Sequence, residues 1–108
     1  MSNGIPEHDW KVFKQLHPIA LERYCQKVLR ELGQISADAS QTPHERYLAV
    51  YKLIQQRDKD LSGAFDDFRR STASLQIGII YSLGVITEEE LTRFTPETRA
   101  RVLYFFRA

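Results

Sequence analysis

The chain has 108 residues, 43% of them hydrophobic and 27% charged, which fits one globular domain and excludes the charge-rich composition of disordered proteins. Fifteen Lys and Arg residues face fourteen Asp and Glu residues, and the net charge of +1 excludes a strong overall field for binding polyanions. We therefore expect a single helical domain over residues 1–108, with a disordered N-terminal tail over residues 1–7.

Trp10, Phe13 and Leu16 recur at intervals of three and predict a short first helix near residues 8–16. Pro18 disfavours the helical conformation of the residue before it, so we expect a break there and a second helix over residues 18–36. The expected buried face of this second helix consists of Leu21, Tyr24, Cys25, Val28, Leu29 and Leu32.

A capping box predicts the start of the third helix, because Thr42 and Glu45 flank a proline at the first helical position, Pro43. The helix is expected over residues 43–70, with a bend or interruption at residues 62–63. Its expected buried stripe consists of Tyr47, Val50, Tyr51, Ile54, Leu61, Phe65 and Phe68.

Residues 72–83 have features of both helix and strand. Ser71 can cap a helix and Gly84 can end one, while no second strand is visible as a partner, so we predict a helix and leave strand as the alternative. Gly78 in this helix would let a neighbouring segment approach closely.

Two further helices follow. Thr87 and Glu90 repeat the capping-box pattern ahead of residues 88–94, and Thr95 followed by Pro96 predicts a last helix over residues 96–106. The whole pattern indicates an all-α bundle of about six helices.

No motif for metal or cofactor chemistry is present. The histidines and Cys25 have no metal-ligand spacing, and the glycines match no phosphate-binding loop. Cys25 lies on an apolar stripe, where a small buried hydrophobic residue is expected rather than a reactive thiol. We expect neither a cofactor nor a metal, and the absence of a catalytic motif favours a protein that is not an enzyme.

The cellular location is inferred from two features. A lone cysteine forms no internal disulfide, and residues 1–10 contain no apolar signal segment. The most apolar stretch, residues 77–86, is about half as long as a membrane-spanning helix. We therefore expect a cytoplasmic protein that does not bind membranes.

Two surfaces are candidates for binding a partner. The first is a basic patch, and the second is the crowded C-terminal run 103–106, whose four consecutive residues cannot all face the interior of the domain. The candidate residues are Arg23, Lys27, Arg30, Arg69, Arg70, Tyr104 and Phe105.

Three stretches, 44–47, 65–70 and 84–91, resemble segments of small bacterial cytosolic proteins of unknown function. The resemblance implies local structure and no activity. Such proteins are sometimes described as similar to peptide-release factors. This chain has no Gly-Gly-Gln tripeptide, which peptide-release factors need for catalysis.

Three functions are consistent with the sequence. The one we favour is a non-enzymatic protein-interaction or regulatory module of a bacterial cytosol that can self-associate as a homodimer. The second is a nucleic-acid- or ribosome-associated factor that uses the basic patch. The third is a small enzyme without a linear motif, with a pocket assembled from His44, Tyr47, Tyr51 and Arg70.

Overall fold

The computed structural model describes residues 4–106, and within these residues it contains helices and no strand. The helices are α1 (Glu7–Ser36), α2 (Pro43–Phe65), α3 (Ala73–Ser82), α4 (Glu88–Leu91) and α5 (Pro96–Phe106), with a short 3-10 turn, η1 (Arg70–Thr72), before α3. The all-α prediction is confirmed, and the doubtful segment 72–83 is helical.

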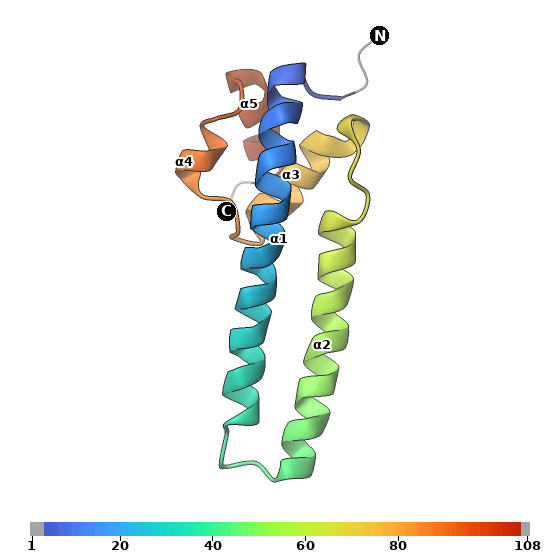
Figure 1. Cartoon of the computed structure of the whole chain (residues 1–108), viewed down its shortest axis with the longest axis vertical. Coiled ribbons are helices and arrows are strands. Elements are labelled where there is room, and N and C mark those ends of the chain that lie inside the picture. Colours follow the sequence, from blue (N-terminus) through green and yellow to red (C-terminus); the bar gives the residue numbers. More distant parts are fainter. Residues whose placement is uncertain (1–3, 107–108) are drawn as a thin grey trace.

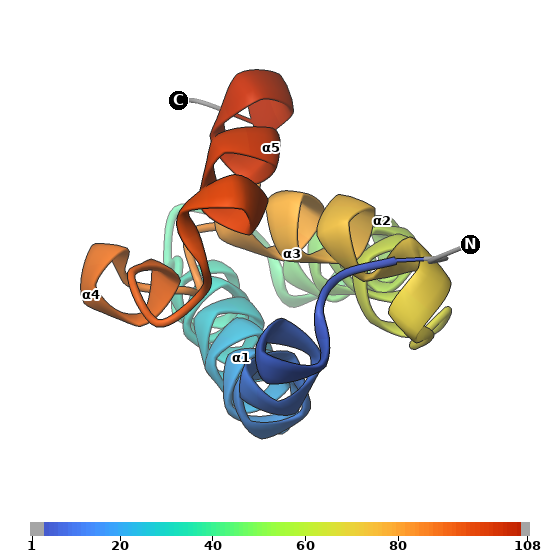
Figure 2. The same ribbon diagram turned by 90° about the horizontal axis from the view of Figure 1, so that it is seen from above.

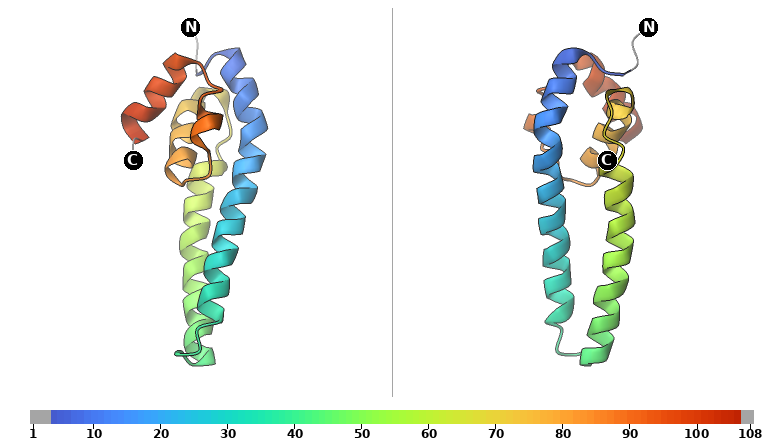
Figure 3. Two further views of the ribbon diagram at one scale, coloured as in Figure 1. Left: turned by 90° about the vertical axis from the view of Figure 1, so that its left-hand side faces the viewer. Right: turned by 45° about the vertical axis from the view of Figure 1, so that its right-hand side comes forward.

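α1 and α2 form an antiparallel hairpin, and the other helices gather at one end of it (Figure 1). Viewed along the hairpin, α3 lies between α1 and α5 (Figure 2). The opposite end of the hairpin extends with no other described segment beside it (Figures 1 and 3), so the molecule measures 57 × 24 × 22 Å. We call residues 4–27 and 59–106 the head, and residues 28–58 the free half of the hairpin.

The hydrophobic core lies entirely in the head. Its buried residues are Ile5, Val12, Phe13, Leu16, Ala20, Tyr24, Ala64, Phe65, Ala73, Ile77, Ile80, Val85, Ile86, Leu91, Phe94 and Val102. Among the described residues, the free half contributes no buried side chain to this core. The head is therefore the part that holds the fold together, and the free half is stabilised by the seam between its two helices.

The predicted break before Pro18 is wrong, because α1 continues through it from Glu7 to Ser36. Pro18 is exposed, so the backbone hydrogen bond that it cannot make is lost on the outer side of the helix, where water can replace it. Leu16 and Ala20 are buried on either side of it. Their packing offsets the proline, which costs a helix interior about 3 kcal/mol.

α2 passes through residues 62–63 without interruption but ends at Phe65, so its predicted extension to residue 70 is also wrong. We attribute this end to Phe68: the chain leaves the helical conformation after Phe65, and the Phe68 ring packs against α1. Its ring centroid lies 5.0 Å from that of Trp10 and 4.1 Å from that of His17. This aromatic contact closes the head end of the hairpin.

Most predicted helix boundaries that depend on local signals are correct. Thr42 and Thr87 both form complete capping boxes. Gly84 follows the C-cap residue of α3, Leu83, and adopts a φ of 78°, a conformation that favours glycine. The differences are small: α4 ends at Leu91 rather than at residue 94, and Ser71 lies in η1 instead of capping α3.

The N-terminal segment joins the core earlier than expected for a tail over residues 1–7. Ile5 is 1% exposed, and its carbonyl accepts a hydrogen bond of 2.8 Å from Nε of Arg70. Residues 1–3 lie outside the described residues. Ile5, two residues before the start of α1, is therefore already part of the hydrophobic core.

Asp9 connects the start of α1 to the start of α5. Its carboxylate is fully buried and accepts hydrogen bonds from the backbone N–H of Thr95 at 2.8 Å and from the hydroxyls of Thr95 and Thr98 at 2.6 and 2.5 Å. Burial raises the pKa of this carboxyl, but the three hydrogen bonds outweigh burial, and the net pKa is lowered below 3.8. A charged carboxylate therefore holds the last helix in place.

Candidate interaction surface

Three large side chains that the sequence pattern predicts to be buried are exposed on α2. The exposed fractions are 67% for Tyr47, 55% for Tyr51 and 47% for Ile54. Their spacing of four and three residues places them in one column along the helix. The prediction of burial is wrong for these residues because in the free half α2 has only α1 as a neighbour, and one neighbour covers one narrow seam.

A second column lies on α1, where Cys25, Leu29 and Leu32 repeat the same spacing. Leu29 is 61% exposed, contrary to its predicted burial, while Cys25 and Leu32 are half-buried. Cys25, Leu29 and Ile54 together line one groove of about 230 Å³ between the two helices. The two columns therefore lie on the same side of the hairpin, and we call these six residues the hairpin face.

The hairpin face carries little charge. Arg57 and Asp58 are the charged residues that line its groove, and they have opposite charges. Arg57 also forms a two-bond ion pair with Glu31 across the seam, at 3.1 and 3.0 Å. Hydrogen bonding to this guanidinium lowers the pKa of Glu31, so the pair stays ionised and pins α1 to α2.

The head is attached to the other side of α1, through two of the predicted basic residues. Arg23 forms two hydrogen bonds of 2.6 and 2.8 Å with Glu90 and one of 3.1 Å with the carbonyl of Val85. Lys27 donates to the carbonyl of Leu83 at 2.8 Å, at the end of α3. Both side chains therefore hold the loop before α4 against α1.

The remaining predicted basic residues do not join Arg23 and Lys27 in one patch. Arg69 pairs with Asp67 at 2.7 Å, and Arg70 pairs with Glu7 at 2.9 Å, both near the N-terminal end of α1. Arg30 is exposed on the free half of the hairpin. The five residues are thus spread along the molecule, and four of them contact acidic or carbonyl groups of the same chain.

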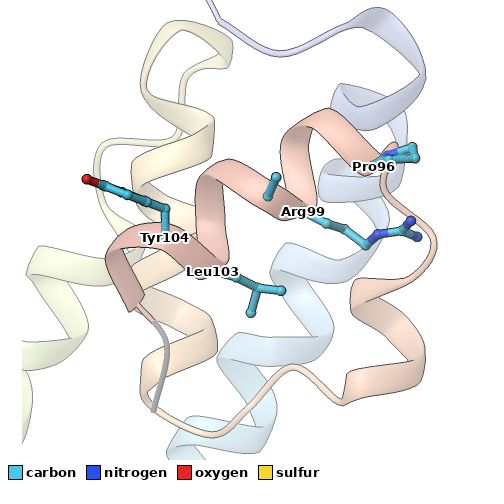
Figure 4. Close-up of a pocket in the computed structure, with 5 residues that line it drawn as sticks. Pro96, Arg99, Leu103 and Tyr104 are labelled. Atoms are coloured by element: carbon cyan, nitrogen blue, oxygen red, sulfur yellow. The ribbon is translucent and has the colours of Figure 1, made fainter.

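The C-terminal candidate residues lie on α5. Tyr104 is 81% exposed, whereas Val102 is buried, and the side chain of Phe105 is outside the described part of the chain. Tyr104 borders a depression of about 530 Å³ that Pro96, Arg99, Ala100 and Leu103 also line (Figure 4). All five lining residues belong to α5, so a single helix forms the wall of the depression. A depression with one wall cannot enclose a substrate.

The residues proposed for a scattered catalytic pocket are separated. His44, Tyr47 and Tyr51 lie in the first turns of α2, at the tip of the hairpin, whereas Arg70 follows the other end of that helix. A helix of 23 residues is about 35 Å long. The described residues also contain no group of three or more His, Cys, Asp or Glu side chains that could hold a metal ion.

No helix within residues 4–106 has the length and apolar character needed to cross a bilayer. Comparisons with known protein families, with curated proteins and with solved structures give no match for the chain.

Sequence reasoning placed the residues of the hairpin face in the core and missed them as a surface. One signal was available in the sequence. The stripe Tyr47, Val50, Tyr51 and Ile54 is wider than the single seam that an antiparallel partner helix can cover, so part of it had to remain exposed.

Proposed function

We propose that this protein is a non-enzymatic interaction module that binds a protein chain through the hairpin face. The observation that carries the proposal is the exposure of Leu29, Tyr47, Tyr51 and Ile54 on one side of an uncovered helical hairpin. Their exposed parts amount to an apolar area on the order of 500 Å², near the upper end of the range for monomers, where such patches are often functional.

The composition of the face supports a protein partner. Tyrosine combines a large apolar ring with a polar tip, and it is enriched at protein interfaces. A hairpin presenting two helical columns with a groove between them also matches the usual way in which helices pack side by side. The head supplies the folded base from which the hairpin projects.

The test is selective capture from cytosolic extract of the producing cells. The chain is immobilised in three forms: wild type, a face variant (Leu29→Lys with Tyr51→Lys), and a control variant (Gln34→Lys with Gln56→Lys). The control positions are exposed, and each lies about 140° around its helix from the residue changed in the face variant, Leu29 on α1 and Tyr51 on α2. We expect wild type and control to retain the same proteins and the face variant to lose them. Equal retention by all three forms contradicts the proposal.

A nucleic-acid-binding factor is the second candidate function that the sequence allowed, and the pairing of its basic residues argues against it. Arg23, Arg69 and Arg70 each contact a carboxylate of the same chain. A polyanion would have to displace these contacts. Binding to RNA or duplex DNA at low salt that weakens when Arg69 and Arg70 are both changed to Glu would favour this second function instead.

A further inference from the structure

We propose that the occupant of the hairpin face is a second copy of this chain. The two hairpins would lie face to face with their tips pointing the same way, α1 of each copy over α2 of the other. This inference rests on the proposed function and names its partner. It turns two free hairpins into a four-helix bundle in which every adjacent pair of helices is antiparallel.

The area of the face fits a self-association site. Two copies of a patch on the order of 500 Å² bury at most about 1,000 Å², and with the polar rim this reaches the lower limit for a specific interface. A two-fold symmetric dimer also uses the same patch on both copies, so a single exposed face satisfies both partners. The head does not obstruct this, because Arg23 and Lys27 attach it to the other side of α1.

The shapes of the two columns favour the arrangement of α1 over α2. The column on α1 is the narrower one, with Cys25, Leu29 and Leu32, whereas the column on α2 is bulkier, with Tyr47, Tyr51 and Ile54. Placing the bulky column of one copy on the narrow column of the other gives even filling between the helices. The opposite orientation would stack tyrosine on tyrosine along one side and leave a gap along the other.

The charge of the face is compatible with a copy of itself. A surface with an excess of one sign would repel its own copy. In the groove Arg57 and Asp58 have opposite charges, and Arg57 is paired with Glu31 of the same chain. The six residues of the hairpin face themselves are uncharged. Contact between these six residues is therefore not opposed by like charges among them.

Complementary charge variants test the proposal. Leu29→Lys and Ile54→Glu are both made at exposed positions, so each variant is expected to fold, which circular dichroism and thermal unfolding verify. In the proposed dimer Leu29 faces the partner's Ile54. Sedimentation equilibrium should show wild type reaching the mass of two chains as concentration rises, each variant remaining a monomer, and the equimolar mixture regaining the dimer through one Lys–Glu contact.

The controls separate this inference from the proposed function. Gln34→Lys and Gln56→Glu, on the other side of the hairpin, should dimerise like wild type. A wild-type chain that stays monomeric at all concentrations overturns the second copy as partner. The capture experiment then decides independently whether the face binds a different protein. Dimerisation that survives both face variants, or a mixture that stays monomeric, overturns the arrangement proposed here.

Discussion

The ring of Phe106 at the end of α5 lies directly over Gly78 in α3, at the place where any other residue would put its Cβ atom. This close approach was expected from a glycine in the middle of an apolar helix, and it is one of the contacts that hold α5 against α3. The other helical glycines, Gly33 and Gly63, have nothing within 4 Å of a Cβ built at their positions.

Gly78→Ala should therefore lower the free energy of unfolding by about 1–2 kcal/mol, because the methyl group displaces the ring of Phe106. Gly33→Ala and Gly63→Ala should raise it by about 0.5–1 kcal/mol each, since alanine is the better helix former. Chemical denaturation measures all three. In a Phe106→Ala background the Gly78→Ala penalty should disappear, and stabilisation by Gly78→Ala in the wild-type background would contradict this packing.

Asp9→Asn should weaken the attachment of α5 to α1. The carboxylate accepts three hydrogen bonds in a fully buried position, and an amide presents donors to the hydroxyls of Thr95 and Thr98. We expect a loss of about 2–3 kcal/mol in the free energy of unfolding. The matched control is Glu7→Gln, at an exposed ion pair with Arg70, which should change stability by less than about 1 kcal/mol. Equal effects of the two substitutions would contradict the role given to Asp9.

The ion pair of Arg23 with Glu90 predicts a pH dependence. Hydrogen bonds from Arg23 lower the pKa of Glu90 from 4.5 to about 2. Because the pKa is lower in the folded state, the stabilisation is complete above about pH 4.5 and is lost as the pH falls toward 2.

Arg23→Gln should return the pKa of Glu90 toward 4.5, which an NMR titration of the side-chain carboxyl measures. Arg23 is 40% exposed, so the loss in stability at neutral pH should stay near 1 kcal/mol. A pKa of Glu90 that does not move in the variant would contradict this account.

Local signals in the sequence were sufficient for much of the fold. The capping boxes at Thr42 and Thr87 depend on residues three apart, and the start of α5 depends on Thr95 and Pro96, so each could be located from its immediate neighbours. The continuity of α1 could not, because it depends on the burial of residues on both sides of Pro18. Local propensity favours a break there, and tertiary packing overrides it.

The candidate site was beyond the reach of local patterns for a similar reason. The spacing of Tyr47, Tyr51 and Ile54 correctly indicates one side of a helix, but whether that side is covered depends on how many helices lie beside it. The roles of Arg23 and Lys27 likewise depend on acceptors 56–67 residues away along the chain. Periodicity identifies an apolar side, and only the assembled fold separates the part that is core from the part that is surface.

Hydrogen exchange of the backbone amides at increasing protein concentration tests most directly the claim that the free half of the hairpin is the binding surface. In the free monomer the amides of residues 28–36 and 44–58 should exchange rapidly, because two helices joined by one seam open easily. If the hairpin faces pair, these amides should be increasingly protected as concentration rises, while those of α3 and α5 stay unchanged. Exchange in the free half that is independent of concentration, or protection that appears only in the head, would contradict the account.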